Sequence, residues 1–272
     1  MKTRVLSGII MVPLLLVIWF GGIWLWAAAA VIAVAGLMEF YNGFRNMEVE
    51  PSNAIGIVCA AVLFLGLLAG IVTGRLSSFI YGFLLLWMCL SVAAGFIYGW
   101  KITVRGPYDA MATVCGLVYI PFFAAHIVLL DQTEYRLLTW IIVLAAFGSD
   151  IFAYFTGYLI GKHKMAPNLS PKKTIEGGIG GIVGGTVRSG LFGFFFLWEQ
   201  LLLCLALGLV GSAAAEAGDL TASAFKRRMG IKDYGHLIPG HGGIMDRFDS
   251  VLFVAPVLYY LTVFATGSFF HG

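Results

Sequence analysis

The chain has 272 residues, of which 60% are apolar and only 11% are charged. A soluble domain carries about 25% charged residues, so this composition excludes a soluble globular enzyme, a disordered chain and a nucleic-acid-binding protein. The net charge of +3 points to no polyanionic macromolecule as a partner. The sequence therefore predicts an all-α integral membrane protein.

Apolar runs predict about nine transmembrane helices, because one span needs about 20 apolar residues. The first two runs meet at Gly21-Gly22, and together they are too long for one ordinary helix, so we expect a hairpin there. The predicted spans lie near Val5–Gly22, Ile23–Phe44, Ala54–Thr73, Phe79–Tyr98, Ala110–Leu130, Leu137–Ile160, Gly177–Leu197, Leu201–Thr221 and Val251–Ser268.

Basic residues predict the orientation, since cytoplasmic loops carry an excess of Lys and Arg. With the N-terminus placed in the cytoplasm, all but three of the 17 Lys and Arg residues lie on the cytoplasmic side. The exceptions are Arg75 and Arg136 on the other side and Arg188 inside a predicted span. We therefore expect a cytoplasmic N-terminus in a cell membrane.

Charge is also uneven along the chain. More than half of the charged residues lie between Asp150 and Asp249. This distribution predicts that residues 1–136 form a transmembrane scaffold and that residues 137–272 form the region that carries the chemistry.

A polar helix face is predicted where the eighth span ends. Five residues recur at steps of three and four, so they share one face of a helix: Glu216, Asp219, Ser223, Lys226 and Arg227. Ionisable groups inside a membrane are rare and usually functional. The alternative is a structural cluster of charges that neutralise one another.

A glycine-rich turn follows, between Lys232-Asp233 and the last span. The run Pro239-Gly240-His241-Gly242-Gly243 cannot lie inside a helix, and backbone of this kind before a helix binds anions. Asp246, Arg247 and Asp249 come next. One such carboxylate could simply complement the helix dipole, but the whole set indicates a divalent-metal and polyphosphate site.

Two stretches resemble a known family. The run Ser223-Ala-Phe-Lys226-Arg227, with Lys232-Asp233, Pro239-Gly-His241-Gly-Gly and Asp246-Arg247-Phe-Asp249, resembles the signature of the CDP-diacylglycerol synthases, also called phosphatidate cytidylyltransferases. The stretch from Ser149-Asp150 through Ser170-Pro171-Lys172-Lys173-Thr174 to Glu176-Gly177 is similar to the same family. The resemblance covers the second half closely, with the signature at residues 223–249. It implies transfer of the cytidylyl group from CTP to phosphatidate, with Mg²⁺ required.

The second stretch also has a chemical interpretation of its own. Asp150, in the middle of an apolar run, is predicted to be a buried acid that either faces a metal or pairs with Arg188. Thr174 can cap the following helix. Lys172 and Lys173 at that helix start favour a bound phosphate, with lipid headgroups as the alternative. For Lys162 and Lys164 we favour the headgroup interpretation.

The predicted site combines both stretches. The predicted metal ligands are Asp219 and Asp246, supported by Asp249 or Glu216. The predicted catalytic residues are Asp219, Asp246, Lys226, Arg227 and His241. The predicted substrate-binding residues are Lys172, Lys173, Ser223, Lys232, Gly242, Gly243 and Arg247. His241 is assigned to a phosphate or base contact, because no second His or Cys stands at zinc-ligand spacing.

The expected partners are CTP, phosphatidate and membrane lipid, with Mg²⁺ as cofactor, Mn²⁺ as its substitute, and a homodimer left open. Two other functions are kept as alternatives. One is a CTP-dependent lipid kinase of the dolichol-kinase type, which would transfer the γ-phosphoryl group. The other is a membrane transporter, against which stand the asymmetric charges and the lack of an inverted repeat. The roles of Arg188 and Glu39 are left open, with a structural role assigned to Glu39.

Overall fold

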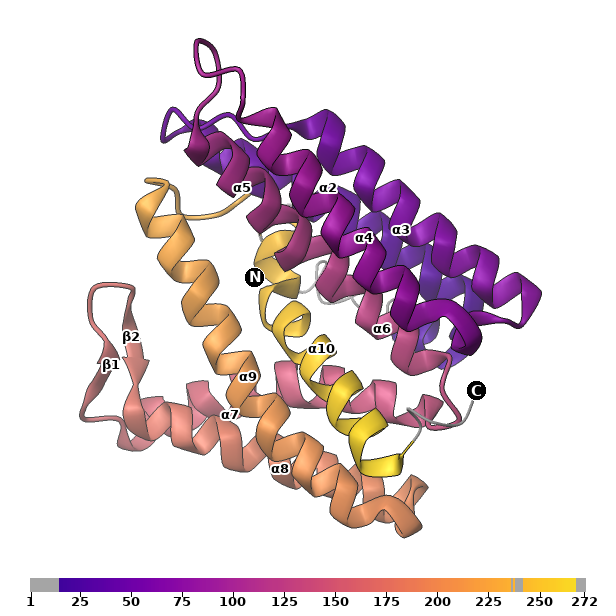
Figure 1. Ribbon diagram of the computed structural model, residues 1–272. Coiled ribbons are helices and arrows are strands. Elements are labelled where there is room, and N and C mark those ends of the chain that lie inside the picture. The colour runs from indigo at the N-terminus through magenta and orange to yellow at the C-terminus, as the bar shows by residue number, and fades with distance from the viewer. Residues whose placement is uncertain (1–14, 236, 238–241, 268–272) are drawn as a thin grey trace. The chain divides into compact units, whose positions relative to one another are not determined.

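The computed structural model describes residues 15–235, 237 and 242–267 (Figure 1). Within these residues, eight helices are long and apolar enough to cross a membrane. The prediction of an all-α, multi-span membrane protein is therefore confirmed. The predicted first span, Val5–Gly22, lies mostly outside the described residues, which show it as helical only at 15–20. The predicted break is present, because Gly21 and Gly22 both have a positive φ, at 58° and 52°.

The chain divides into two compact units. Of the described residues, the first contains those within 15–128 and 228–247, and the second contains those within 129–227 and 248–267. The segment 228–247, which holds much of the signature, is thus counted with the N-terminal helices. The predicted division at residue 136 stays a prediction.

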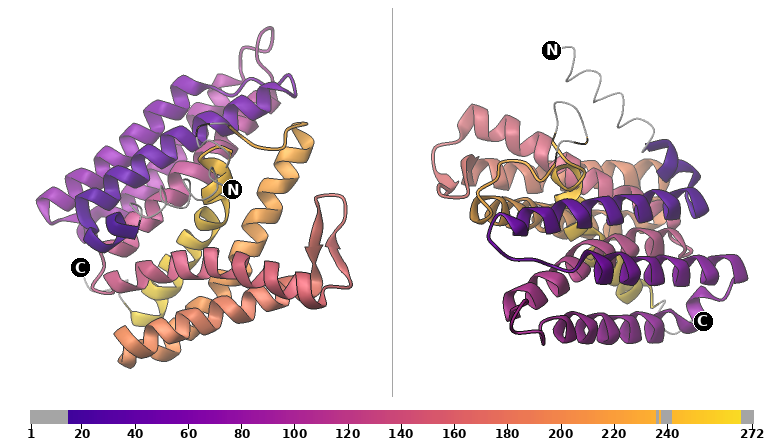
Figure 2. Two further views of the ribbon diagram at one scale, coloured as in Figure 1. Left: turned by 180° about the vertical axis from the view of Figure 1, so that it is seen from behind. Right: turned by 90° about the horizontal axis from the view of Figure 1, so that it is seen from above.

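The first unit is built from consecutive apolar helices. They are α2 (Gly22–Arg45), α3 (Asn53–Thr73), α4 (Leu76–Tyr98) and α5 (Pro107–Leu117), followed by the π-helical turn η1 (Val118–Phe122) and α6 (Phe123–Asp131). Neighbours in the chain pack side by side, as α3 and α4 do (Figure 2). The π-helical turn holds Pro121, which has no N–H to donate to a regular helix.

Tyr41 on α2 organises the core of this unit. Its side chain is fully buried, and its hydroxyl donates a 2.7 Å hydrogen bond to the carbonyl of Thr113 on α5. Gly56 on α3 and Gly116 on α5 lie against its ring, where a β-carbon would come within 2.7 and 2.3 Å of ring atoms. The tight contact of α2 with α3 and α5 fixes the position of the α2 residues next to Tyr41.

The second unit contains η2 (Arg136–Leu138), α7 (Thr139–Ile160), the strands β1 (Lys164–Ala166) and β2 (Ser170–Thr174), α8 (Ile175–Phe196), η3 (Trp198–Gln200) and α9 (Leu201–Arg228). The last helix, α10 (Met245–Thr266), lies in this unit from Phe248 onward. Helices α7 and α8 pack closely because glycines of α8 face α7: a β-carbon on Gly181 would lie 2.9 Å from the carbonyl oxygen of Ser149.

Two local features differ from the sequence prediction. The segment between α7 and α8, for which the sequence predicted no strand, is an antiparallel β-hairpin, with Lys164 opposite Thr174 and Ala166 opposite Ser170. Helix α9 continues seven residues past the predicted end at Thr221. It therefore carries Ser223, Lys226 and Arg227 on the same helix as Glu216 and Asp219, as their spacing predicted.

Candidate active site

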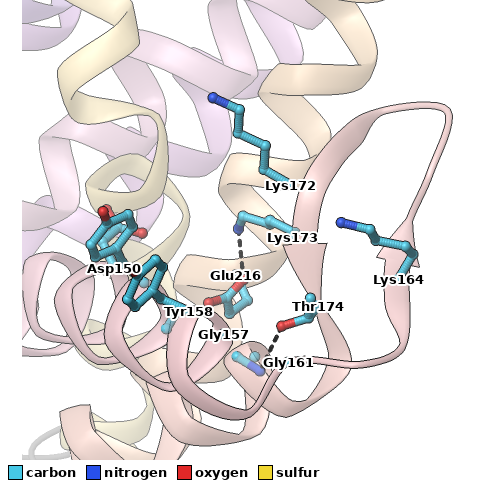
Figure 3. Close-up of a pocket in the computed structure, with 13 residues that line it drawn as sticks. Asp150, Gly157, Tyr158, Gly161, Lys164, Lys172, Lys173, Thr174 and Glu216 are labelled. Atoms are coloured by element: carbon cyan, nitrogen blue, oxygen red, sulfur yellow. Dashed lines mark hydrogen bonds and ion pairs between the residues drawn. The ribbon is translucent and has the colours of Figure 1, made fainter.

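A pocket of about 480 Å³ opens in the second unit between the β-hairpin and α7 (Figure 3). Lysines from the hairpin stand on one side, and residues of α7 stand on the other. Glycines form much of the remaining wall. The lining consists of Asp150, Ala153, Tyr154, Gly157, Tyr158, Gly161, Lys164, Lys172, Lys173, Thr174, Gly177, Gly178 and Glu216.

Thr174 connects the hairpin to the helices. It ends β2 and caps α8, because its side-chain oxygen accepts a 3.1 Å hydrogen bond from the backbone N–H of Gly177. The predicted cap is therefore confirmed. The same oxygen lies 2.9 Å from the β-carbon position of Gly157 on α7 and 2.6 Å from that of Gly161, the residue that follows α7. Glycine at these two positions lets the hairpin approach α7 directly.

Lys173 is held between two carboxylates of α9. Its Nζ lies 2.7 Å from Glu216 Oε2 and 2.7 Å from Asp219 Oδ2. The side chains are 19%, 8% and 28% exposed for Lys173, Glu216 and Asp219, respectively. Burial by itself would lower the pKa of Lys173, but the charges of Asp219 and Glu216 outweigh it and raise the pKa above its ordinary value. Lys173 is therefore an ammonium ion at neutral pH.

Asp150 lies on the pocket wall and not in the interior. Its side chain is exposed, which corrects the prediction of a buried acid. Its neighbour Ser149 is the buried residue, and the Ser149 hydroxyl donates a 3.4 Å hydrogen bond to Glu216 Oε1. Arg188 packs against Gly148 on α7, with its Nη1 3.5 Å from the β-carbon position of that glycine.

Arg227, at the end of α9, contacts the same hairpin. Arg227 donates through Nε to the carbonyl of Leu169, at 3.2 Å, so it holds the turn between the two strands. Lys226 and Asp219 both lie within electrostatic range of Asp249, which is buried at 7% exposure on α10. Ser223 is half-buried on α9.

A second group of predicted residues lies in the first unit, at the start of α10. Asp246 accepts two backbone hydrogen bonds on Oδ2, from Tyr234 at 2.7 Å and from Gly243 at 3.0 Å. Gly242 has φ +83°, and a β-carbon there would lie 2.9 Å from Asp246 Oδ2, so only glycine suits this position. Lys232 is exposed, while His241 lies outside the described residues.

Glu39, to which the sequence analysis assigned a structural role without a partner, also contributes at this place. Its Oε1 accepts a hydrogen bond from the N–H of Ile244 at 3.1 Å, and its Oε2 accepts one from the N–H of Met245 at 2.9 Å. These are the amides that begin α10, where a helix has N–H groups without helical partners. The only signal available was an acid inside a predicted span.

The predicted site residues fall into two groups in the structure. In the second unit, Lys173 is in direct contact with Glu216 and Asp219. Lys172 lies on the same strand as Lys173, Lys226 and Arg227 lie on the same helix as the two acids, and Asp249 lies on α10. In the first unit, Gly242, Gly243, Asp246 and Arg247 follow one another at the start of α10, with Lys232 in the preceding segment. That both groups serve one catalytic centre stays a prediction.

The carboxylates of Glu216 and Asp219 are the candidate ligands for a divalent cation in this pocket. Within the parts of the chain that the structure describes, no three Asp, Glu, His or Cys side chains gather closely enough to hold a metal ion. Glu216 and Asp219 nevertheless direct one oxygen each at a single cation, the Lys173 ammonium, which stands in for a metal. Since Mg²⁺ commonly binds one or two carboxylates together with substrate phosphates and water, this pair fits it.

The pocket also includes residues that the sequence did not assign to a site. Tyr154 and Tyr158, one helical turn apart on α7, stack with ring centroids 6.4 Å apart and are largely exposed. Lys164, which we assigned to lipid headgroups, lines the pocket with Lys172. No sequence signal could have found it, because the short strand that carries it, Lys164–Ala166, shows no strand pattern.

Comparison with known proteins covers nearly the whole chain. The sequence profile of the cytidylyltransferase family matches residues 2–265. The phosphatidate cytidylyltransferase of Staphylococcus haemolyticus is 34% identical over 278 residues, covering 97% of this chain and 99% of that protein. The enzymes of the same name from Staphylococcus saprophyticus and Staphylococcus aureus are 32% and 31% identical, with the same coverage of both chains.

Proposed function

The chain belongs to the cytidylyltransferase family, and we propose that it transfers the cytidylyl group of CTP to phosphatidate. The products are CDP-diacylglycerol and pyrophosphate. The observation that carries the proposal is the pocket lined by the hairpin lysines, where Lys173 contacts Glu216 and Asp219 of α9. Apolar helices lie next to this pocket. It combines the cations that bind phosphates with a surface that suits a lipid.

Phosphatidate suits this pocket by its two chemical parts. Lys172 and Lys164 provide two ammonium groups for the phosphate monoester. Tyr154 and Tyr158 provide aromatic surface next to them, of the kind that is enriched where a membrane meets water. The lipid therefore enters with its phosphate against the hairpin and its acyl chains toward the exposed apolar face of α7.

CTP is assigned to the segment at the start of α10. Gly242 and Gly243 leave backbone unshielded there, and Arg247 adds a guanidinium that can bind two phosphate oxygens at once. Lys226, Arg227 and Lys232 add positive charge for the triphosphate. His241 is assigned to the nucleotide as well.

Mg²⁺ is the proposed cofactor, with Mn²⁺ as its substitute. Glu216 and Asp219 would hold the ion, with Asp249 and Asp246 as further carboxylates. When bound, the ion supplies positive charge that neutralises phosphate oxygens and aligns them for substitution.

The reaction is a substitution at phosphorus. A phosphate oxygen of phosphatidate attacks the α-phosphorus of CTP, a new P–O bond forms, and the bond to the β-phosphate breaks as pyrophosphate leaves. The attacking phosphate is already anionic near neutral pH, so no strong general base is required. The protein's task is to bring two polyanions together, which its Lys and Arg residues do by charge neutralisation and positioning.

The location follows from the same residues. We place the protein in the bacterial inner membrane with its N-terminus and active site on the cytoplasmic side, because the basic segments that bind phosphates face the side rich in Lys and Arg. CTP is then available on the side where the pocket opens. A homodimer is compatible with this arrangement.

The test uses CTP labelled with ³²P at either the α- or the γ-phosphorus, with the purified protein in mixed micelles of phosphatidate. The proposal requires the α-label in lipid and the γ-label in pyrophosphate. A γ-label in lipid with dolichol as acceptor would establish the lipid kinase instead. Solute flux in liposomes without CTP, with no labelled lipid, would establish the transporter. An Asp219→Asn variant, expected to be inactive, controls for a contaminating enzyme.

A further inference from the structure

Glu39 supports the start of α10 from a helix more than 200 residues away in the sequence. Its two carboxylate oxygens accept from two consecutive amides, those of Ile244 and Met245. We propose that Glu39 is a positioning residue for CTP, which holds Gly242, Gly243 and Asp246 in the arrangement that binds the nucleotide. This inference rests on the proposed function.

The position of the Glu39 carboxylate is determined from several sides. A β-carbon on Gly243 would lie 2.3 Å from Oε2, and one on Gly235 would lie 2.4 Å from Oε1. A side chain at Gly235 or at Gly243 would therefore displace the carboxylate from its present position. A negative charge at this end of α10 is also favoured by the helix dipole.

The surroundings of Glu39 tie the segment to α2. Phe40, the next residue, is fully buried and packs against Tyr234, with ring centroids 5.9 Å apart. The backbone N–H of Tyr234 in turn donates to Asp246. A chain of contacts thus runs from α2 through Tyr234 to the predicted ligand Asp246, in parallel with the direct bonds from Glu39 to the start of α10.

Removing the Glu39 carboxylate should therefore act on the nucleotide site without removing a group that touches the nucleotide. The loss of one hydrogen bond to a charged group changes a binding constant by about tenfold or more. The Glu39→Gln variant keeps one acceptor oxygen, but its amide NH₂ faces a backbone donor. We expect KM for CTP to rise about tenfold in Glu39→Gln and further in Glu39→Ala, while KM for phosphatidate stays within twofold.

The control is Glu48→Gln, the same chemical change at an exposed residue just after α2. It should leave both constants at the wild-type values. A purely structural role for Glu39 would lower the amount of active enzyme, so that Vmax falls and neither KM changes. That result in Glu39→Gln would overturn the proposal.

A measurement without substrates separates this inference from the proposed function. Hydrogen–deuterium exchange of the peptide that contains Ile244 and Met245 should be faster in Glu39→Gln than in the wild type and in Glu48→Gln. Unchanged exchange would refute the support of α10 by Glu39, whatever the activity. A different outcome is faster exchange in Glu39→Gln together with a wild-type protein that forms no labelled lipid. That outcome would reject the proposed function, and with it the role of Glu39 in CTP binding. Glu39 would then only hold the start of α10.

A second variant covers the case in which Glu39→Gln does not fold. Gly235→Ala leaves Glu39 chemically intact but places a methyl group where the carboxylate now lies. It should raise KM for CTP in the same way, and combining it with Glu39→Gln should add little. Wild-type KM for CTP in Gly235→Ala would contradict the proposed geometry.

Discussion

The ion triad of Lys173, Glu216 and Asp219 yields a quantitative prediction for the Lys173→Met variant. The methionine keeps most of the apolar stem but leaves two carboxylates facing each other without a cation. Breaking a buried pair in this way costs about 3–5 kcal/mol. We take the lower end, about 3 kcal/mol, because Asp219 is 28% exposed. With an unfolding entropy of about 2.1 cal/mol/K per residue, a chain of 272 residues should lose about 5 °C in Tm.

The assay is thermal unfolding in detergent, with Lys172→Met as the matched control. Lys172 is the exposed neighbour on the same strand, so its loss should change stability by no more than about 0.5 kcal/mol. Adding Glu216→Gln to Lys173→Met should restore part of the lost stability, because it removes one of the two repelling charges. Equal Tm values for Lys173→Met and Lys172→Met would refute the energetic role of the triad.

Mg²⁺ should stabilise the Lys173→Met variant more than the wild type, since the ammonium no longer competes for the two carboxylates. At ten times its Kd, a ligand that binds only the folded state adds about 1.4 kcal/mol. If Mg²⁺ shifted Tm equally in both proteins, the carboxylates of Glu216 and Asp219 would not be its site.

The pH dependence of the triad follows from the raised pKa of Lys173. A cation whose pKa is raised in the folded state stabilises fully at any pH below its unfolded value, about 10.4. That stabilisation is lost only as the pH rises through the folded pKa. The Tm difference between wild type and Lys173→Met, measured at a series of pH values, should therefore be constant from about pH 6 to about pH 9.

Three further predictions concern activity. Transfer should stop in EDTA and return with Mg²⁺, as measured by labelled lipid, and full activity in the chelator would contradict the carboxylate pair as a metal site. Asp219→Asn and Asp246→Asn should each lower turnover by orders of magnitude with unchanged helical circular dichroism; wild-type turnover would remove that residue from the site. Lys172→Gln should raise KM for phosphatidate about tenfold, whereas Lys162→Gln should not, and equal small effects would leave Lys172 with headgroup contact only.

Much of the fold could be predicted because its signals are local. Apolar length alone defines a span, so α3 and α7 begin and end within two residues of the predicted bounds. The β-hairpin could not be predicted in the same way. Its strands have three and five residues, and Ser170–Thr174 shows no alternation of apolar and polar residues that would indicate a strand.

The site was predictable as a set of residues but not as a set of contacts. Spacing placed Glu216 and Asp219 on one helix face, and the lysines were assigned to phosphates. Lys173 pairs with those two acids because α9 packs beside the hairpin. Sequence spacing could not show this contact, since Lys173 and Glu216 are 43 residues apart in the chain. Glu39 is the extreme case, because its partner at Ile244 lies 205 residues away.

The hairpin continues into α8 without an intervening linker. Thr174 is both the last residue of β2 and the N-cap of α8, so the pocket lysines share a stiff joint with a membrane-spanning helix. Such helices change their tilt when the hydrocarbon thickness changes. A change in the tilt of α8 should therefore move Lys172 and Lys173 with it, so we expect bilayer thickness to act on the shape of the pocket that these lysines line.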